Sequence, residues 1–127
     1  MPSFGTIKAD TLTHSTAGSV TTDNVVEGSA KAWSISGLDD TTIDDSFNTA
    51  SQTDHGTGKP SYAFTNSFVN INHADVGLIG NNSAHIFYNG GDAAKSSSTT
   101  GNFRLYDTGN THTDSNFINV ISIGDLA

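Results

Sequence analysis

The stretch "AKAWSIS", residues 30–36, alternates large side chains with small ones. Successive side chains of a β-strand point to opposite faces, so this alternation predicts a strand. Trp33 and Ile35 then share one face. The small side chains share the other face: Ala32, Ser34 and Ser36. We expect the face with Trp33 to be turned into the protein core, because large apolar side chains are usually buried.

Short runs of the same kind recur along the chain, and turn-forming residues follow most of them. One lies around residues 45–51, and the others are "SYAFTNSF" (61–68), "DVGLIG" (75–80), "AHIFYN" (84–89), "NFRLYD" (102–107) and "NFINVISI" (116–123). Amphipathic helix periodicity is almost absent. About seven such strands predict an all-β fold, an antiparallel β-sandwich or jelly roll. The expected inner face consists of Trp33, Ile35, Phe47, Phe64, Phe87, Phe103, Leu105, Phe117 and Ile121.

The chain divides into an arm and one domain, since 127 residues suffice for a single core. Residues 1–27 are polar and rich in Thr, as in "TLTHSTAGSVTTDN" (11–24), and predict an extended arm that needs a partner surface. Residues 28–127 form the predicted sandwich. Only 34% of the residues are hydrophobic, so the core is thin and oligomerisation would add buried surface.

Charge and composition exclude several classes of partner. With 13 acidic residues against 5 basic ones, the chain repels phosphate backbones, so we expect no nucleic-acid partner. No run of about 18 apolar residues exists to span a membrane as a helix. The start, "MPSFGTIKAD", lacks the apolar region of a secretory signal, so we expect no export as a precursor. Cysteine is absent, which excludes disulfides and thiolate metal sites.

The segment "HGTGKP", residues 55–60, invites comparison with phosphate-binding loops. A P-loop needs G-x-x-x-x-G-K-[ST] between a strand and a helix. Here Gly56 and Gly58 are too close, and Lys59 is followed by Pro60 and another strand. We therefore predict a hairpin turn in which the glycines adopt positive φ and Pro60 begins the next strand.

No constellation of residues indicates catalysis or a bound metal. Four acidic residues could approach a calcium ion, but their spacing fits no EF-hand loop and favours a solvated loop: Asp39, Asp40, Asp44 and Asp45. Five histidines share no metal-ligand spacing: His14, His55, His73, His85 and His112. There is no G-x-S-x-G elbow, and Glu27 is the only Glu. We expect neither an enzyme nor a cofactor.

Aromatic residues outside the expected core are the better functional indication. Tyr88, Tyr106 and Phe68 lie near strand ends or opposite the inferred inner face. Exposed rings can stack on sugars or contact another protein, with the loop 90–102 beside them. Ordinary packing within a β-sandwich is the alternative for all three rings.

The segments "GSAKAWSISG", "DSFNTASQTDHGTG" and "YAFTNSF" resemble a group of small virion-associated proteins of tailed bacteriophages, especially those of marine bacteria. The group carries an IKVDT-L/I stretch, a G-x-AKAW segment, a D/A-SFN stretch, a TD-x-GTG turn and a strand ending in FT. This chain matches them at residues 7–12, 28–33, 45–48, 53–58 and 64–65, and has a similar "GD" at 124–125. Ala9 stands where Val is usual, and "KP" replaces the usual Asp-Tyr. The resemblance covers most of residues 6–68 and fades beyond them.

The resemblance implies a β-rich, trimeric surface component of a virion and brings no catalytic residues with it. We expect a capsid decoration protein on the exterior of the head, with the major capsid protein as partner. The alternative is a tail-fibre or tail-tip module that binds a host glycan or receptor, and a polysaccharide hydrolase is a distant third. The expected partner-binding residues lie on the arm and beside the aromatic loops: Ile7, Lys8, Asp10, Leu12, Tyr88 and Tyr106.

Overall fold

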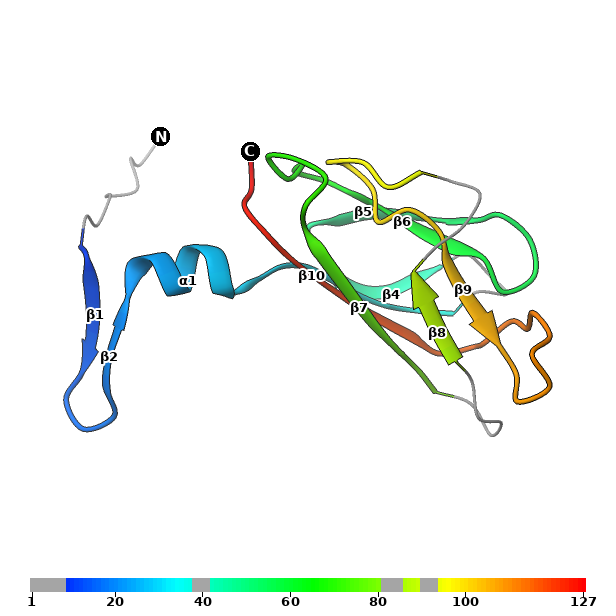
Figure 1. Ribbon diagram of the computed structural model, residues 1–127, viewed down its shortest axis with the longest axis horizontal. Coiled ribbons are helices and arrows are strands. Elements are labelled where there is room, and N and C mark those ends of the chain that lie inside the picture. The colour runs from blue at the N-terminus through cyan, green and yellow to red at the C-terminus, as the bar shows by residue number, and fades with distance from the viewer. Residues whose placement is uncertain (1–8, 38–41, 81–85, 90–93) are drawn as a thin grey trace.

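The protein consists of a two-layered β body and an arm that projects from one end of it (Figure 1). The structure is a computed structural model, and it describes residues 9–37, 42–80, 86–89 and 94–127. Within these residues it contains ten strands and one short helix. Every strand pair is antiparallel, so the predicted all-β antiparallel fold is confirmed.

One layer of the body is a four-stranded sheet in the order β4-β3-β10-β7. The bounds of these strands are β3 Ala30–Ser36, β4 Ile43–Phe47, β7 Ala74–Ile79 and β10 Ile118–Ile123. The central pair, β3 and β10, joins the predicted first strand to the last one, which are far apart in the sequence. The sheet therefore holds the first and last strands of the body together as neighbours.

The opposite layer consists of two hairpin-like pairs, β5-β6 and β8-β9. Their bounds are β5 Thr49–Asp54, β6 Pro60–Phe64, β8 Ile86–Asn89 and β9 Phe103–Tyr106. The turn between β5 and β6 is as predicted, with φ of 106° at Gly56 and 67° at Gly58. Its Gly58 amide donates to the Asp114 carboxylate at 2.7 Å, which fixes the turn against the end of the body.

The core lies between the two layers, and its aromatic rings come mainly from the layer with β6 and β9. Tyr62, Phe103 and Leu105 come from β6 and β9, and they pack against Ile118 and Val120 of β10. A second cluster contains Ala32, Phe64 and Phe68. The predicted burial of Phe64, Phe103 and Leu105 is therefore confirmed.

The orientation predicted for the four-stranded sheet is wrong. In β3 the small residues face inward: Ala32, Ser34 and Ser36 are buried. Five residues predicted to be inside lie on the outer side or at its margin instead, half-buried or exposed: Trp33, Ile35, Phe47, Phe117 and Ile121. The large rings of the opposite layer fill the interior, so only small side chains fit on β3 across from them. The side chain of Phe87, also expected inside, lies outside the described part.

The arm has more regular structure than the extended segment expected from its sequence. It contains a hairpin, β1 Thr11–His14 with β2 Gly18–Thr21, followed by the helix α1 Thr22–Gly28. The Thr21 side chain caps this helix by accepting the Asn24 amide at 3.5 Å. None of the helical residues is buried. Among the described residues no helix has the length and apolar character needed to cross a membrane.

Candidate interaction surface

The side of the four-stranded sheet that faces away from the core, here called the outer face, carries many apolar side chains. Residues directly opposite each other in antiparallel strands point to the same side. One row crosses all four strands and is entirely apolar: Phe47, Trp33, Ile121 and Val76. The next row is Asp45, Ile35, Asn119 and Leu78. Asp45 brings the one charge in these two rows, at the β4 edge of the face.

The outer face is open to solvent in the chain by itself. Leu78 is 74% exposed and Val76 58%, while Trp33 and Ile35 are half-buried by their neighbours. Two hollows of about 280 Å³ each run along β10, one beside Leu78 and one beside Trp33. Trp33 points to the side of β3 opposite the buried residues Ala32 and Ser34 of the same strand. Contiguous apolar surface of this kind on a folded protein marks an interaction site.

The arm carries apolar residues that also lack cover. Leu12 and Val20 are cross-strand partners in the hairpin, so their side chains lie side by side on one face. Leu12 is 46% exposed and Val20 40% exposed. Val25 and Val26 of α1 are exposed as well. The arm therefore presents an apolar surface of its own, separate from the outer face.

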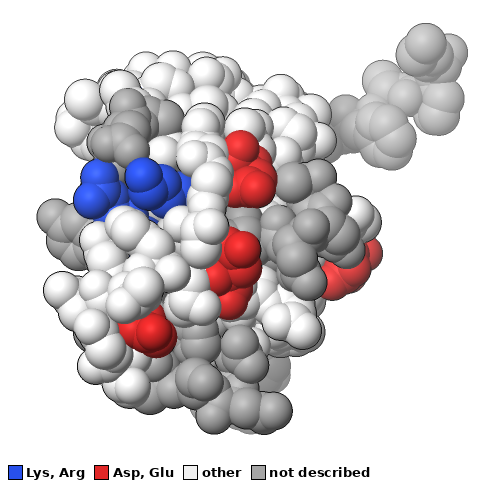
Figure 2. All heavy atoms as spheres, turned by 90° about the vertical axis from the view of Figure 1, so that its right-hand side faces the viewer, with Lys and Arg blue, Asp and Glu red and all other residues white. Residues whose placement is uncertain are grey.

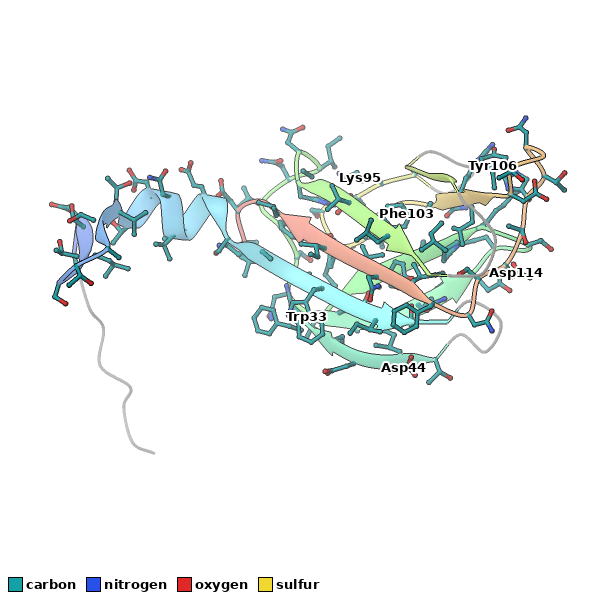
Figure 3. The ribbon with its side chains drawn as sticks, turned by 90° about the horizontal axis from the view of Figure 1, so that it is seen from below. Trp33, Asp44, Lys95, Phe103, Tyr106 and Asp114 are labelled. Carbon is teal, nitrogen blue, oxygen red and sulfur yellow. The ribbon has the colours of Figure 1, made fainter. Side chains whose placement is uncertain are left out.

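The residues predicted to bind partners do not form one site. Leu12 belongs to the exposed pair on the arm, and Asp10, also exposed, accepts the Thr22 amide through its carbonyl at 3.0 Å. Tyr106 lies at the other end of the molecule (Figure 3). It stacks on His112, with ring centroids 4.4 Å apart, so one face of its ring is covered. The remaining three predicted residues have side chains outside the described part: Ile7, Lys8 and Tyr88.

For Phe68 the alternative of ordinary packing holds, and the ring is not an exposed aromatic. Its side chain is buried, 4.8 Å from the Phe64 ring and stacked on the His73 ring at 4.5 Å between centroids. Phe68 ends the predicted run 61–68 and has the same parity as Tyr62 and Phe64, but β6 itself ends at Phe64. The bridge that pairs Phe68 with Leu126 explains its burial, because it ties this stretch to the C-terminal segment.

A buried polar cluster beside Phe68 was not predicted. The Asp75 carboxylate forms an ion pair with Lys95 Nζ at 2.8 Å. Its Oδ1 also accepts the Ser122 hydroxyl at 2.6 Å and lies 2.9 Å from His73 Nδ1. Lys95 additionally donates to the His73 carbonyl. No sequence signal indicates this cluster, because Lys95 and Ser122 come from segments distant from the pair His73 and Asp75.

The cluster contains Ser, His and Asp but lacks the geometry of a catalytic triad. In a triad the imidazole accepts the proton of the serine hydroxyl. Here Ser122 donates to Asp75, and His73 Nε2 lies 2.9 Å from the Ser96 carbonyl oxygen. The Ser122 side chain is also buried. The arrangement therefore joins β7, β10 and the 94–99 segment and leaves no activated nucleophile.

The acidic residues near β4 do not gather into a metal site within the described part of the chain. Asp44 is exposed (Figure 3), and so is Asp45, whose Oδ1 accepts the Ser46 amide at 2.8 Å. Asp39 and Asp40 lie outside the described residues. Among the residues described, no three His, Asp or Glu side chains are grouped to hold a metal ion.

The end of the body opposite the arm has mixed charge. Figure 2 shows one small group of Lys and Arg side chains there, with Asp and Glu side chains in separate places. Neither sign forms a continuous surface among the described residues in this view. The outer face therefore remains the most extensive candidate for binding. No family model, curated protein or solved structure matches this chain.

Proposed function

We propose that this protein is a structural component of a bacteriophage virion: a capsid decoration (cement) protein on the exterior of the head. The observation that carries the proposal is the outer face, whose apolar row crosses all four strands from Phe47 to Val76. A chain that exposes such a surface is suited to permanent assembly with other proteins. The resemblance of residues 6–68 to small virion proteins of tailed phages is the reason to propose that this assembly is a phage virion.

Cementing is a linkage effect. A protein that binds the assembled shell, and not its separate subunits, stabilises the shell against disassembly in proportion to its binding free energy. The proposed partners are further copies of this chain, in a homotrimer, and the major capsid protein. The arm, which stands away from the body, extends the reach of each copy across neighbouring subunits (Figure 1).

A non-catalytic role agrees with the chemistry of the polar cluster. The Ser122 hydroxyl donates its hydrogen bond to the Asp75 carboxylate, and both ring nitrogens of His73 have oxygen partners. These bonds rigidify one end of the body. We therefore propose a binding protein and no hydrolase.

Quantitative protein counts on purified virions test the location. Intact virions of a phage that encodes this chain are separated into heads and tails, and the copies of each protein are counted by mass spectrometry. Hundreds of copies with the heads support decoration. Heads that lack the protein should then release DNA at a lower temperature, and adding the purified protein back should restore their stability.

A tail-fibre or tail-tip module is the second candidate, and Tyr106 favours it. The ring is half-buried, stacked on His112 on one side, and lies at the end of the body away from the arm (Figure 3). A supported aromatic ring of this kind suits stacking on a sugar. Recovery with tails in small multiples of three, together with glycan binding that Tyr106→Ala abolishes, would support this role over decoration.

A further inference from the structure

We propose that the outer face binds the N-terminal arm of a second copy of this chain. The inference rests on the surface that supports the proposed function, but it can be tested on the purified protein without virions. Each copy has two uncovered apolar surfaces, the outer face and the arm. In the proposed assembly the arm of one copy covers the outer face of another.

The arm needs a surface outside its own chain. Its hairpin has strands of four residues and its helix has seven. A lone two-stranded hairpin is marginal in water, and so are isolated helices shorter than about 12–15 residues. Neither Leu12 nor Val20 is buried against the body, and the same holds for all of α1. A contact with another copy supplies the missing burial.

The connection between arm and body directs the arm away from its own outer face. The Ser29 hydroxyl donates to the Val25 carbonyl at 2.6 Å, and Lys31 Nζ donates to the same oxygen at 3.3 Å. The Lys31 bond ties the end of α1 to the start of β3, and the arm continues outward from there (Figure 1). Folding back onto Trp33 of the same chain would break it. A neighbouring copy can receive the arm without that loss, as in domain swapping.

The dimensions of the two surfaces match. Four strands spaced about 4.8 Å apart make the outer face roughly 19 Å wide, whereas the hairpin is about 10 Å wide and about 13 Å long. The hairpin therefore fits on the face, with α1 beside it. Leu12 and Val20, side by side, would meet the row that contains Trp33 and Ile121.

The buried area favours a closed assembly over a single contact. One arm on one face buries on the order of 600–800 Å² in total, the size of a crystal-packing contact. Each copy has one arm and one outer face, so a closed ring or a two-fold exchange gives it two such contacts. The sum, about 1,200–1,600 Å², reaches the range of stable specific interfaces. Pairing two outer faces directly would leave both arms uncovered.

Cross-linking tests the contact directly, because the chain contains no cysteine. Two differently tagged full-length variants, Val20→Cys and Ile121→Cys, are co-expressed and treated with a short flexible bismaleimide. A covalent heterodimer is expected. The control pairs Val20→Cys with Val69→Cys, an exposed valine on the loop before β7, and should give none. Equal yields from the two pairs would overturn the proposal.

The mass of the purified protein provides the second measurement, by light scattering at about 100 μM. The wild type should be a closed oligomer, and both Leu12→Asp and Ile121→Asp should be monomers with an unchanged circular dichroism spectrum. The controls Thr11→Asp, on the other side of the hairpin, and Val69→Asp should remain oligomers. A monomeric wild type refutes the proposal, and so does an oligomer that Ile121→Asp dissociates but Leu12→Asp does not. Neither result affects the count of copies in virions.

Discussion

The hydroxyl of Tyr62 on β6 lies 2.9 Å from the hydroxyl of Ser36 on β3, and both side chains are buried. This bond spans the interior and joins the two layers of the body. It also explains why β3 turns its small residues inward, since the Tyr62 ring occupies the space that a large residue on β3 would need. The bond has consequences that can be measured.

Stability should fall at high pH because of Tyr62. Burial raises the pKa of Tyr62 from 10.0 to about 12, although the Ser36 hydrogen bond opposes the shift. The folded state binds the phenol proton more tightly than the unfolded chain does. The resulting contribution of Tyr62 to the free energy of unfolding is therefore fully present below about pH 10 and is lost as the pH rises to about 12. We expect a loss on the order of 2 kcal/mol in urea denaturation across this interval.

The Tyr62→Phe variant is the control for that titration. It cannot ionise, so its free energy of unfolding should fall less between the same two pH values. At neutral pH it should be about 1–3 kcal/mol less stable than the wild type, because Ser36 loses its buried partner. Equal pH dependence in the two proteins would contradict the assignment to Tyr62.

Two isoleucines on β10 should respond differently to truncation. Ile118 is 0% exposed and Ile121 42% exposed, on opposite faces of the same strand. Ile118→Ala should cost about 2–5 kcal/mol, because it leaves a cavity in the core. Ile121→Ala should cost less than about 1 kcal/mol when both are measured in the Leu12→Asp background, which removes association. Similar losses would contradict the orientation of the sheet.

The stability of the protein should depend strongly on Asp75, which provides the single carboxylate of the polar cluster. Asp75→Asn leaves Lys95 without its ionic partner and weakens the contacts with His73 and Ser122. Breaking a buried pair in this way costs about 3–5 kcal/mol. Asp44→Asn, at an exposed position, is the matched control and should change the unfolding free energy little. Thermal melting of the two variants measures the difference.

Replacing Gly56 or Gly58 of the β5–β6 turn with alanine should destabilise the protein to different extents, although both glycines have positive φ. A Cβ at Gly58 would lie 2.7 Å from the Leu105 carbonyl oxygen, whereas a Cβ at Gly56 would have no heavy atom within 4 Å apart from those of its own residue and its two neighbours in the chain. Gly56→Ala should cost about 1 kcal/mol for the strained backbone alone. Gly58→Ala must also displace backbone, so its melting temperature should fall clearly further. Equal effects would argue against the close approach of this turn to β9.

The period-two alternation of the sequence determined most strands of the body, and the glycines with Pro60 determined the β5–β6 turn, because both depend on neighbours in the chain. The alternation did not indicate the β1-β2 hairpin, nor that the single strand predicted around residues 45–51 divides into β4 and β5, which belong to different sheets. Alternation in "AKAWSIS" is equally compatible with either face being buried. The tertiary structure decided that question: the rings of Tyr62 and Phe103 fill the interior, so β3 presents its small residues to them and Trp33 turns outward. The outer face and the Asp75 cluster combine residues from distant segments, so their existence depended on strand pairing that no local pattern specifies.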